Sequence, residues 1–281
     1  MVEIGKINTL TVSRIGPYGT YLQGGEHGDI LLLRAGASNG HEAGDQLEVF
    51  IYIDADDTVL ASSVHPAIVA GECKALKVVA LEDHGAFLDW GLKSDLFVPR
   101  SQQMGDMAVG STCVVIAMLD DTTHRMIASA RLYHYLSDES DGDFEAGQSV
   151  ALLVCQHTDL GYKAVVDGTH LGMLYSNEVF QEIQIGDQLT GFIKSVREDG
   201  KIDLTLQKIG AEARNELEAR ILEFLEAHDG VSTLTDKSPP QEIYKVFGVS
   251  KKAYKKALGG LYRSRQIVVG KDKVQLAASK D

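Results

Sequence analysis

Cysteine and proline are scarce in this chain of 281 residues, which has 3 Cys and 5 Pro beside 28 Gly. Cys73, Cys113 and Cys155 stand far apart, without the short paired spacing of a zinc site or the even number of a disulfide framework. We therefore expect the three cysteines to be small, buried, apolar side chains of a protein in a reducing compartment. With 44% apolar residues, the composition is that of a folded, soluble protein with many turns.

Long apolar runs are also missing. No segment approaches the roughly 18 apolar residues that a membrane-spanning helix needs, and the first residues contain no basic stretch that leads into an apolar run. We expect a cytoplasmic protein without a membrane partner.

Several common catalytic motifs have no counterpart. The sequence has no Walker loop ending in Gly-Lys-Ser/Thr, no His-Glu-x-x-His and no Cys-x-x-Cys. The 9 histidines are scattered without ligand spacing. We expect no enzyme, no cofactor and no metal site, although a nuclease whose carboxylates meet only in the fold stays open on the sequence alone.

Positive charge is in short supply, because 27 Lys and Arg against 40 Asp and Glu give a net charge of -13. The deficit is uneven along the chain. Residues 211–281 hold 13 Lys and Arg against 10 Asp and Glu, and residues 245–273 hold nine basic residues against one Asp. An acidic whole is therefore compatible with a polyanion partner near the C-terminus.

Glycine is abundant, and its positions repeat. In three sets, the second glycine follows the first by 14 residues and the third follows the second by 25. The sets are Gly5, Gly19 and Gly44; Gly71, Gly85 and Gly110; and Gly147, Gly161 and Gly186. This spacing indicates one strand-rich module written three times. We expect three small cores rather than one large core.

The second module shows its strands most clearly. Apolar runs alternate with turn residues at 73–81, 86–90, 95–98, 113–119 and 126–130. Five short strands in about 65 residues fit a small Greek-key barrel. The glycine after the first strand is expected to let the chain bend sharply into the second. We place the three barrels at 1–66, 67–138 and 139–210.

The order of these residues resembles the S1 RNA-binding domain, an OB-fold variant: glycine, strand, aromatic or His, glycine, small residue, aromatic, short strand, Gly-Asp and a last hairpin. The resemblance implies that bases stack on aromatic side chains around the middle glycine and on the third strand, beside an Asp and an Arg of the last hairpin. In the second module these positions hold His84, Phe87, Phe97, Asp120 and Arg125.

The other two modules match this pattern less completely. The first offers Tyr18, Tyr21 and Asp54, with Leu31 in place of the third-strand aromatic. The third offers Tyr175 at the third-strand position, Leu160 and Lys163 in place of the first two aromatics, and Lys194, Arg197 and Lys201 on its last hairpin.

An exposed aromatic ring on a barrel offers a stacking surface to unpaired bases, while nearby Lys and Arg contact phosphates. In a simpler interpretation, Tyr18, Tyr21 and Phe87 are ordinary strand aromatics that cover a core. Their recurrence at one offset favours stacking. For Asp54 and Asp120 we expect a turn role first, because Asp side chains bond nearby backbone N–H groups.

From residue 211 on, the periodicity changes to that of helices. Residues 212–227 place apolar side chains on one face and predict an amphipathic helix. Ser238 with Gln241 forms a capping-box pattern for a second helix, and Ser250 is the N-cap of a third. A hairpin follows. Residues 211–281 therefore predict a winged helix of the helix-turn-helix type.

Basic residues cover the third helix and the hairpin. They are Lys251, Lys252, Lys255, Lys256, Arg263, Arg265, Lys271 and Lys273. The four lysines form two i, i+4 pairs whose like charges repel, and a bound polyanion would remove that cost. The simpler interpretation is a solvated helix face.

The fold class expected from these patterns is mainly β with an α+β C-terminal domain: three five-stranded barrels and a winged helix. That order, and the stretch Ser-Lys-Lys-Ala-Tyr-Lys-Lys-Ala-Leu-Gly-Gly-Leu-Tyr at 250–262, resembles the conserved virulence factor B family of bacterial regulatory RNA-binding proteins. The resemblance implies a post-transcriptional regulator that binds single-stranded RNA, in particular mRNA, without catalysis.

Two other functions stay open. A regulator could use the winged helix on duplex DNA, with the acidic barrels as protein-interaction modules. A ribosome or RNA-polymerase accessory protein would recognise its partner through the acidic barrel surfaces. The sequence specifies neither the RNA target nor any protein partner.

Overall fold

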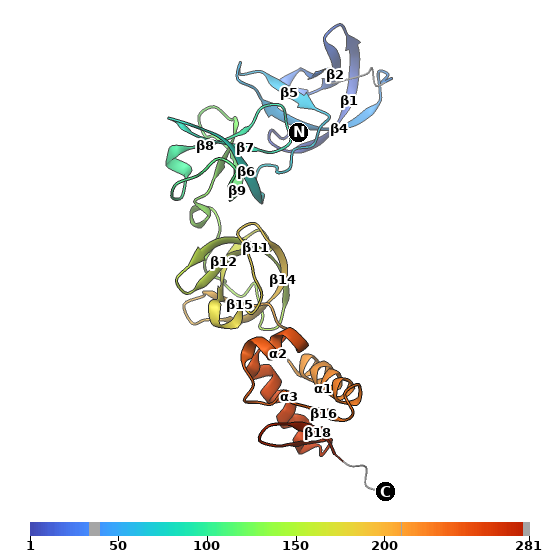
Figure 1. Ribbon diagram of the computed structural model, residues 1–281. Helices are drawn as coiled ribbons and strands as arrows, with labels where there is room; N and C mark the ends of the chain where they lie inside the picture. The colour runs from blue at the N-terminus through green and yellow to red at the C-terminus, as the bar shows by residue number, and fades with distance from the viewer. Residues whose placement is uncertain (34–39, 209, 278–281) are drawn as a thin grey trace. The chain divides into compact units, whose positions relative to one another are not determined.

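The computed structural model describes residues 1–33, 40–208 and 210–277. Within these residues, three closed five-stranded barrels precede a C-terminal domain of three helices and a small sheet (Figure 1). The predicted fold class is confirmed. The chain divides into two compact units, one made mainly of the first two barrels and the other mainly of the third barrel with the C-terminal domain.

The three barrels share one topology. In each, the first three strands follow one another, and the fifth strand lies between the third and the fourth and runs parallel to the third. Barrel 1 consists of β1 (Ile7–Gly16), β2 (Gly19–Gln23), β3 (Asp29–Leu33), β4 (Gln46–Ile53) and β5 (Val59–Ser62). Barrel 2 consists of β6 (Cys73–Glu82), β7 (Gly85–Asp89), β8 (Leu96–Pro99), β9 (Thr112–Leu119) and β10 (Met126–Ser129). Barrel 3 consists of β11 (Ser149–Thr158), β12 (Gly161–Val166), β13 (His170–Tyr175), β14 (Gln188–Val196) and β15 (Ile202–Thr205).

Short 3-10 turns accompany the strands. They are η1 (Gly25–His27), η2 (Arg100–Gln102), η3 (Leu132–His134) and η4 (Ser176–Glu178).

The middle glycine of each module is required by a close approach of two backbones. A Cβ atom at Gly19, Gly85 or Gly161 would lie 2.2, 2.2 or 2.1 Å from a carbonyl oxygen of the neighbouring third strand. Such a contact is far inside the van der Waals limit. At Gly85, whose φ is not positive, this lack of space, and not a left-handed conformation, excludes other residues.

Barrel 1 keeps an apolar core of its own, with Val12, Leu22 and Ile51 among its buried side chains, but one further side chain of this barrel lies in the core of its neighbour. Phe50 of barrel 1 is fully buried and belongs to the apolar cluster that fills barrel 2. Its ring meets the Trp90 ring edge to face, with centroids 5.6 Å apart. Ile68, between the barrels, is also fully buried in this cluster. The apolar surface at the end of barrel 1 is thus covered by its neighbour.

The C-terminal domain is the predicted winged helix. Its elements are α1 (Ala211–Glu226), β16 (Val231–Ser232), α2 (Pro240–Phe247), α3 (Lys251–Arg263), β17 (Ile267–Val269) and β18 (Val274–Leu276), with sheet order β16-β18-β17. Buried side chains from the three helices form one core with Ile267 and Val274. Gly248 ends α2 with a φ of 67°, the left-handed conformation that a tight turn needs.

The start of α2 differs from the sequence prediction. Ser238 is not its N-cap; the Ser238 Oγ instead accepts the Thr235 N–H at 3.0 Å. The helix begins at Pro240, and Pro239 is extended, because a residue that precedes a proline is driven out of the helical region. The predicted cap of α3 is confirmed, since the Ser250 Oγ accepts the Ala253 N–H at 3.2 Å.

We expect Gly85→Ala to destabilise the protein by about 1–3 kcal/mol or more, because the added methyl group overlaps the Val98 carbonyl. Thermal and urea unfolding of the full chain would measure the loss. Gly259→Ala is the matched control: this glycine lies in α3 with nothing within 4 Å of an added Cβ, so it should gain about 0.5–1 kcal/mol. Equal stability of the two variants would contradict the close-approach argument.

Candidate nucleic-acid interface

Two phenyl rings stand side by side on the outside of barrel 2. On β7, Ala86 and Leu88 are fully buried inside the barrel, so the side chain between them, Phe87, points outward. Phe97 lies opposite Phe87 on β8 and is likewise only half-buried. The ring centroids are 5.2 Å apart. This position excludes the interpretation of Phe87 as a core side chain.

The hairpin between β6 and β7 adds His84, which is exposed. A Cβ atom at Gly85 would lie 2.6 Å from Cε2 of Phe97. The glycine therefore does two things, since it admits the third-strand backbone and also leaves room for the Phe97 ring. The structure pairs Phe87 with Phe97, as the sequence predicted for this module, and places His84 in the turn directly before β7.

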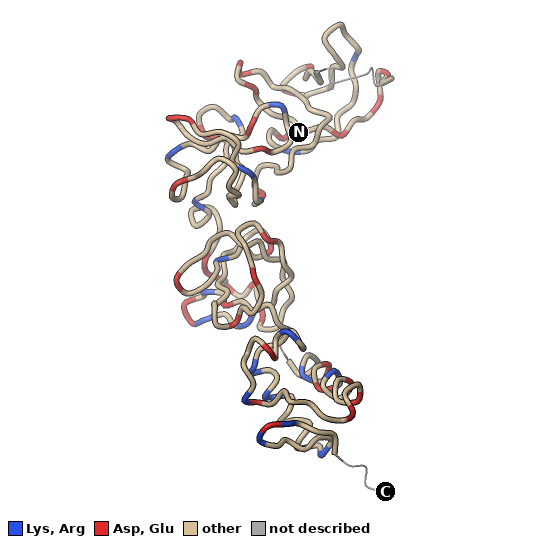
Figure 2. Tube along the Cα trace, viewed as in Figure 1, with Lys and Arg blue, Asp and Glu red and all other residues tan. Residues whose placement is uncertain are grey.

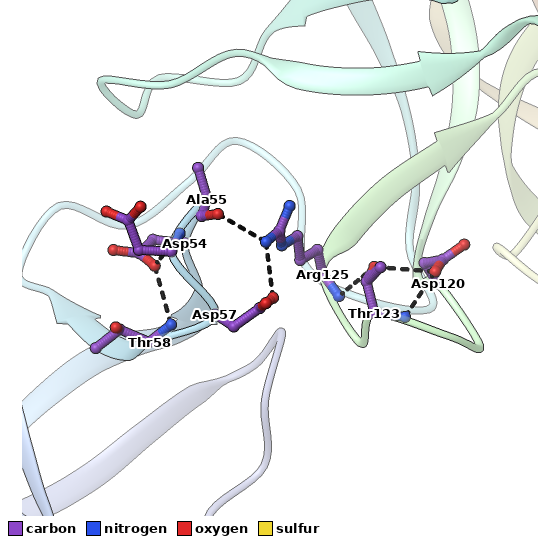
Figure 3. Close-up of polar contacts among 8 residues, drawn as sticks. Asp54, Ala55, Asp57, Thr58, Asp120, Thr123 and Arg125 are labelled. Carbon is purple, nitrogen blue, oxygen red and sulfur yellow. Dashed lines mark hydrogen bonds and ion pairs between the residues drawn. The ribbon is translucent and has the colours of Figure 1, made fainter.

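Arg125 is not part of that surface. Its Nη2 donates to the Ala55 carbonyl and to Asp57 Oδ1, both at 2.7 Å, in the last hairpin of barrel 1 (Figure 3). The arginine that the S1 resemblance assigns to RNA thus holds two barrels together. The sequence could not show this, because the partners are 70 and 68 residues away.

The hairpin carboxylates act as turn residues. Asp54 Oδ1 accepts the N–H groups of Asp56 and Thr58. Asp120 Oδ1 accepts the N–H and the hydroxyl of Thr123 (Figure 3), and these hydrogen bonds hold the pKa of Asp120 below its ordinary value. Their expected first role, in the turns, is what the geometry shows.

Barrel 1 offers a partly covered surface. Tyr18 is 72% exposed in the β1–β2 turn. The Tyr21 ring, in contrast, carries the Arg14 guanidinium 3.6 Å above its centre, and Arg14 is held by Asp29 at 3.1 Å. A base would have to share or displace this cation. Sequence reasoning missed Arg14, which only the β1–β2 register places opposite Tyr21.

In barrel 3 the assignment of Tyr175 to the third-strand position is wrong. Tyr175 lies opposite Gly161, and Met173 lies opposite Lys163, the pairing that corresponds to Phe97 opposite Phe87. Counting along the sequence misplaced the residue by two, because only the strand pairing fixes which residue of β13 faces a given residue of β12.

Tyr175 nevertheless belongs to a cationic cluster. Arg197 hydrogen-bonds the Tyr175 hydroxyl, and Arg197 and Lys194 lie 5.8 and 5.9 Å from its ring centre. Both cations also meet carboxylates: Lys194 is 2.6 Å from Glu178, and Arg197 is 2.8 Å from Asp203. Lys201 is exposed and 4.0 Å from Asp199. The structure thus gathers Tyr175, Lys194 and Arg197, in a different arrangement from barrel 2, and places Lys201 in the turn between β14 and β15.

Basic side chains of the winged helix face solvent. Lys251 donates to the Lys237 carbonyl at 3.2 Å, and Lys255 lies 3.9 Å from Asp236. The other six are exposed, and the described residues place no ion-pair partner within 4.0 Å of them. Figure 2 marks the Lys and Arg positions along the chain trace. They are Lys252, Lys256, Arg263, Arg265, Lys271 and Lys273.

Barrel 3 contacts the turn that leads into α3. Gln207 Oε1 accepts the Ser250 N–H at 3.0 Å, and Gln181 Oε1 accepts the Tyr244 hydroxyl at 3.0 Å. The rings of Phe180 and Tyr244 lie 5.6 Å apart. Sequence analysis singled out none of these residues, and no local pattern links them.

Reactive groups are not prominent in the described part of the chain. The three cysteines form no disulfide there, and burial raises the pKa of Cys73 and of Cys113 to about 11. No group of three or more His, Cys, Asp or Glu among the described residues is placed to hold a metal. None of the described helices is long and apolar enough to cross a membrane.

One motif that serine hydrolases use does occur. Residues 36–40 read Gly-Ala-Ser-Asn-Gly, the spacing that places a nucleophilic serine on a strand-to-helix turn. Residues 36–39 lie outside the described residues. The elements on either side are β3 and β4 of a barrel, which is not the setting that the motif requires.

Comparison with known proteins agrees with this architecture. Residues 4–63 match the S1 domain, and residues 219–276 match the CvfB-like winged helix domain. The uncharacterized protein YitL of Bacillus subtilis is 28% identical, with 94% of this chain and 90% of that protein covered. Conserved virulence factor B of Staphylococcus epidermidis is 23% identical, with 97% and 94% covered.

Similarity extends to solved structures. A multidomain protein with nucleic acid binding domains from Streptococcus pneumoniae is 21% identical, with 97% of this chain and 98% of that chain covered, at a TM-score of 0.43.

An S1 domain at one end and a winged helix at the other make this a multidomain protein of nucleic-acid-binding type. Over nearly its whole length it resembles conserved virulence factor B, which confirms the resemblance seen in the sequence.

We expect Arg125→Ala to lower the stability of the first two barrels by about 1 kcal/mol, because it removes two hydrogen bonds to barrel 1. Its effect on the salt dependence of nucleic-acid binding should be small. Arg100→Ala, which removes an equal charge from an exposed residue of barrel 2, is the control for unfolding in urea. If Arg125→Ala leaves the stability unchanged but reduces the salt dependence of nucleic-acid binding, Arg125 belongs to the binding surface.

Proposed function

We propose that this protein binds single-stranded RNA in the cytoplasm and regulates gene expression after transcription, with mRNA as its target and without catalysing a reaction. Two kinds of contact support binding. Aromatic rings on the barrels stack on unpaired bases, and exposed basic side chains of the winged helix contact phosphates.

The observation that carries the proposal is the pair Phe87 and Phe97. Two large apolar rings held half-exposed on the outside of a barrel contribute little to its core, whose inward positions are filled by Leu88, Leu96 and Val98. Flat faces of this kind suit bases that are not already stacked in a duplex. RNA loops and single strands present such bases.

Duplex DNA is the second candidate, because the lysines of α3 lie on the helix that helix-turn-helix proteins insert into the major groove. In those proteins the N-terminal residues of this helix contact base edges. Here Gln207 of barrel 3 bonds Ser250, the N-cap of α3. The barrel therefore occupies space beside the end of the helix that would enter the groove, which favours a single strand.

Competition binding separates these candidates. A labelled single-stranded RNA bound to the full chain is displaced by unlabelled single-stranded RNA, single-stranded DNA or duplex DNA of equal length, at several stated salt concentrations. We expect RNA to compete best and duplex DNA worst. Stronger competition by duplex DNA would overturn the proposal in favour of a DNA-binding regulator.

We expect the double variant Lys252→Ala and Lys256→Ala to weaken RNA binding and to flatten its salt dependence, by about 0.7 in the logarithmic slope for each lost phosphate contact. Both side chains are exposed on α3. The control is Lys93→Ala, an exposed lysine in the turn after β7. If the slope changes as little for the double variant as for this control, α3 does not anchor the RNA.

Substitution of Phe97 by Ala should reduce RNA affinity by about 5- to 150-fold while leaving the salt slope unchanged, because stacking releases few counterions. Tyr133→Ala is the matched control, since this ring is 49% exposed on η3 and lies outside the stacking pair. Circular dichroism would establish that both variants fold. An equal loss in the two variants would show that any exposed ring contributes, and not this pair in particular.

A further inference from the structure

A small pocket lies where barrel 3 meets the winged helix. Its volume is about 180 Å³, and its lining includes Phe180, Gln181, Gln207 and Tyr244. This is below the roughly 300–1,000 Å³ of sites that enclose a whole small-molecule ligand. A single planar ring system would fit in such a space if the chain that carries it stays outside the pocket.

The pocket combines the groups that recognise a nucleobase. Phe180 and Tyr244 supply aromatic rings, tilted by 33° to each other, and two side-chain amides stand beside them. Proteins that read unpaired RNA bases use aromatic stacking together with hydrogen bonds to the base edge. Carboxylate, amide and aromatic groups are present, but no metal-binding set is found among the described residues.

Gln207 adds an unsatisfied donor. Its Oε1 accepts the Ser250 N–H at 3.0 Å, which fixes the orientation of the amide. Its Nε2 is buried and has no hydrogen-bond partner within the described chain. A buried donor without an acceptor costs free energy. A base whose carbonyl oxygen displaces the side chains that cover this atom would supply the acceptor that the fold does not.

The pocket lies between the Tyr175 cluster and the basic helix α3. Glu178, which lines it, holds Lys194 of the Tyr175 cluster at 2.6 Å. On the other side, Gln207 bonds Ser250, and Lys251 and Lys252 follow directly in α3. A strand whose phosphates contact the exposed lysines of α3 would pass close to the pocket.

We propose that this pocket accepts one unpaired base of the bound RNA strand, with the ring against Phe180 and Tyr244 and a base carbonyl on Gln207 Nε2. This deepens the proposed function and rests on it. The base would fix the register of the strand between barrel 3 and the winged helix.

The test uses the full chain and an RNA selected from a random pool for tight binding. Each nucleotide in turn is replaced by an abasic one, and affinity is measured for the wild type and for Phe180→Ala. At one position, the abasic nucleotide should lower the RNA affinity of the wild type by about 5- to 150-fold and should not lower that of the variant further. At the other positions, the loss of affinity should be the same in both proteins. If the losses of affinity from Phe180→Ala and from the abasic nucleotide add at every position, no base occupies the pocket.

Gln207→Glu provides a second variant that keeps the acceptor for Ser250 but removes the Nε2 donor. Its matched control is Gln181→Glu, which adds the same charge at the pocket and keeps the acceptor for Tyr244. Only Gln207→Glu should abolish the effect of the abasic position. If both variants act alike, charge alone explains the loss and the hydrogen bond is rejected.

Photocrosslinking tests the wild type directly. A 4-thiouridine at the abasic-sensitive position should crosslink to Phe180, Tyr244 or a neighbour in their peptides, as located by mass spectrometry. A crosslink confined to other regions would overturn the pocket while leaving RNA binding intact. Failure of the wild type to bind any single-stranded RNA would instead overturn the proposed function itself.

Discussion

The barrels depend on one close approach, between the glycine that begins the second strand and a carbonyl of the third. No Cβ atom fits there, and this glycine pairs with the equivalent residue of the third strand in every barrel. The residue two places after the glycine then meets the same third-strand position in every barrel. Those pairs are Tyr21 with Leu31, Phe87 with Phe97, and Lys163 with Met173. Each barrel thus presents the same pair of surface positions, one on its second strand and one on its third. Only barrel 2 has an aromatic ring at both.

A second constraint turns barrels 1 and 2 into one body. Phe50 is buried in the core of barrel 2, and Arg125 of barrel 2 donates two hydrogen bonds to the last hairpin of barrel 1. An arginine so engaged is a poor phosphate ligand, because binding an anion would break two existing hydrogen bonds. If barrel 2 binds RNA, its contribution is therefore stacking, and the charge must come from elsewhere in the chain.

Local sequence patterns were sufficient to predict the strands and helices. They did not predict which side chains of different elements contact each other. Strand and helix positions follow from periodicity and from turn residues, so barrels and winged helix were predictable. The true place of Tyr175 depends on strand register, and the start of α2 on the pair Pro239 and Pro240. Arg125 and Asp57 are 68 residues apart, and the pocket gathers residues from 178 to 248. Such contacts arise only when separate elements pack, and a linear pattern carries no sign of them.

The net charge of -13 shapes how such a protein could hold RNA. At physiological salt, charges are screened over about 8 Å, so acidic residues of the barrels need not cancel the basic face of α3. Phosphate contacts weaken steeply as salt rises, whereas stacking depends little on it. In the proposed arrangement the winged helix would capture the strand by charge, and the aromatic surfaces would hold it. The share of the binding energy that stacking supplies would therefore grow with ionic strength.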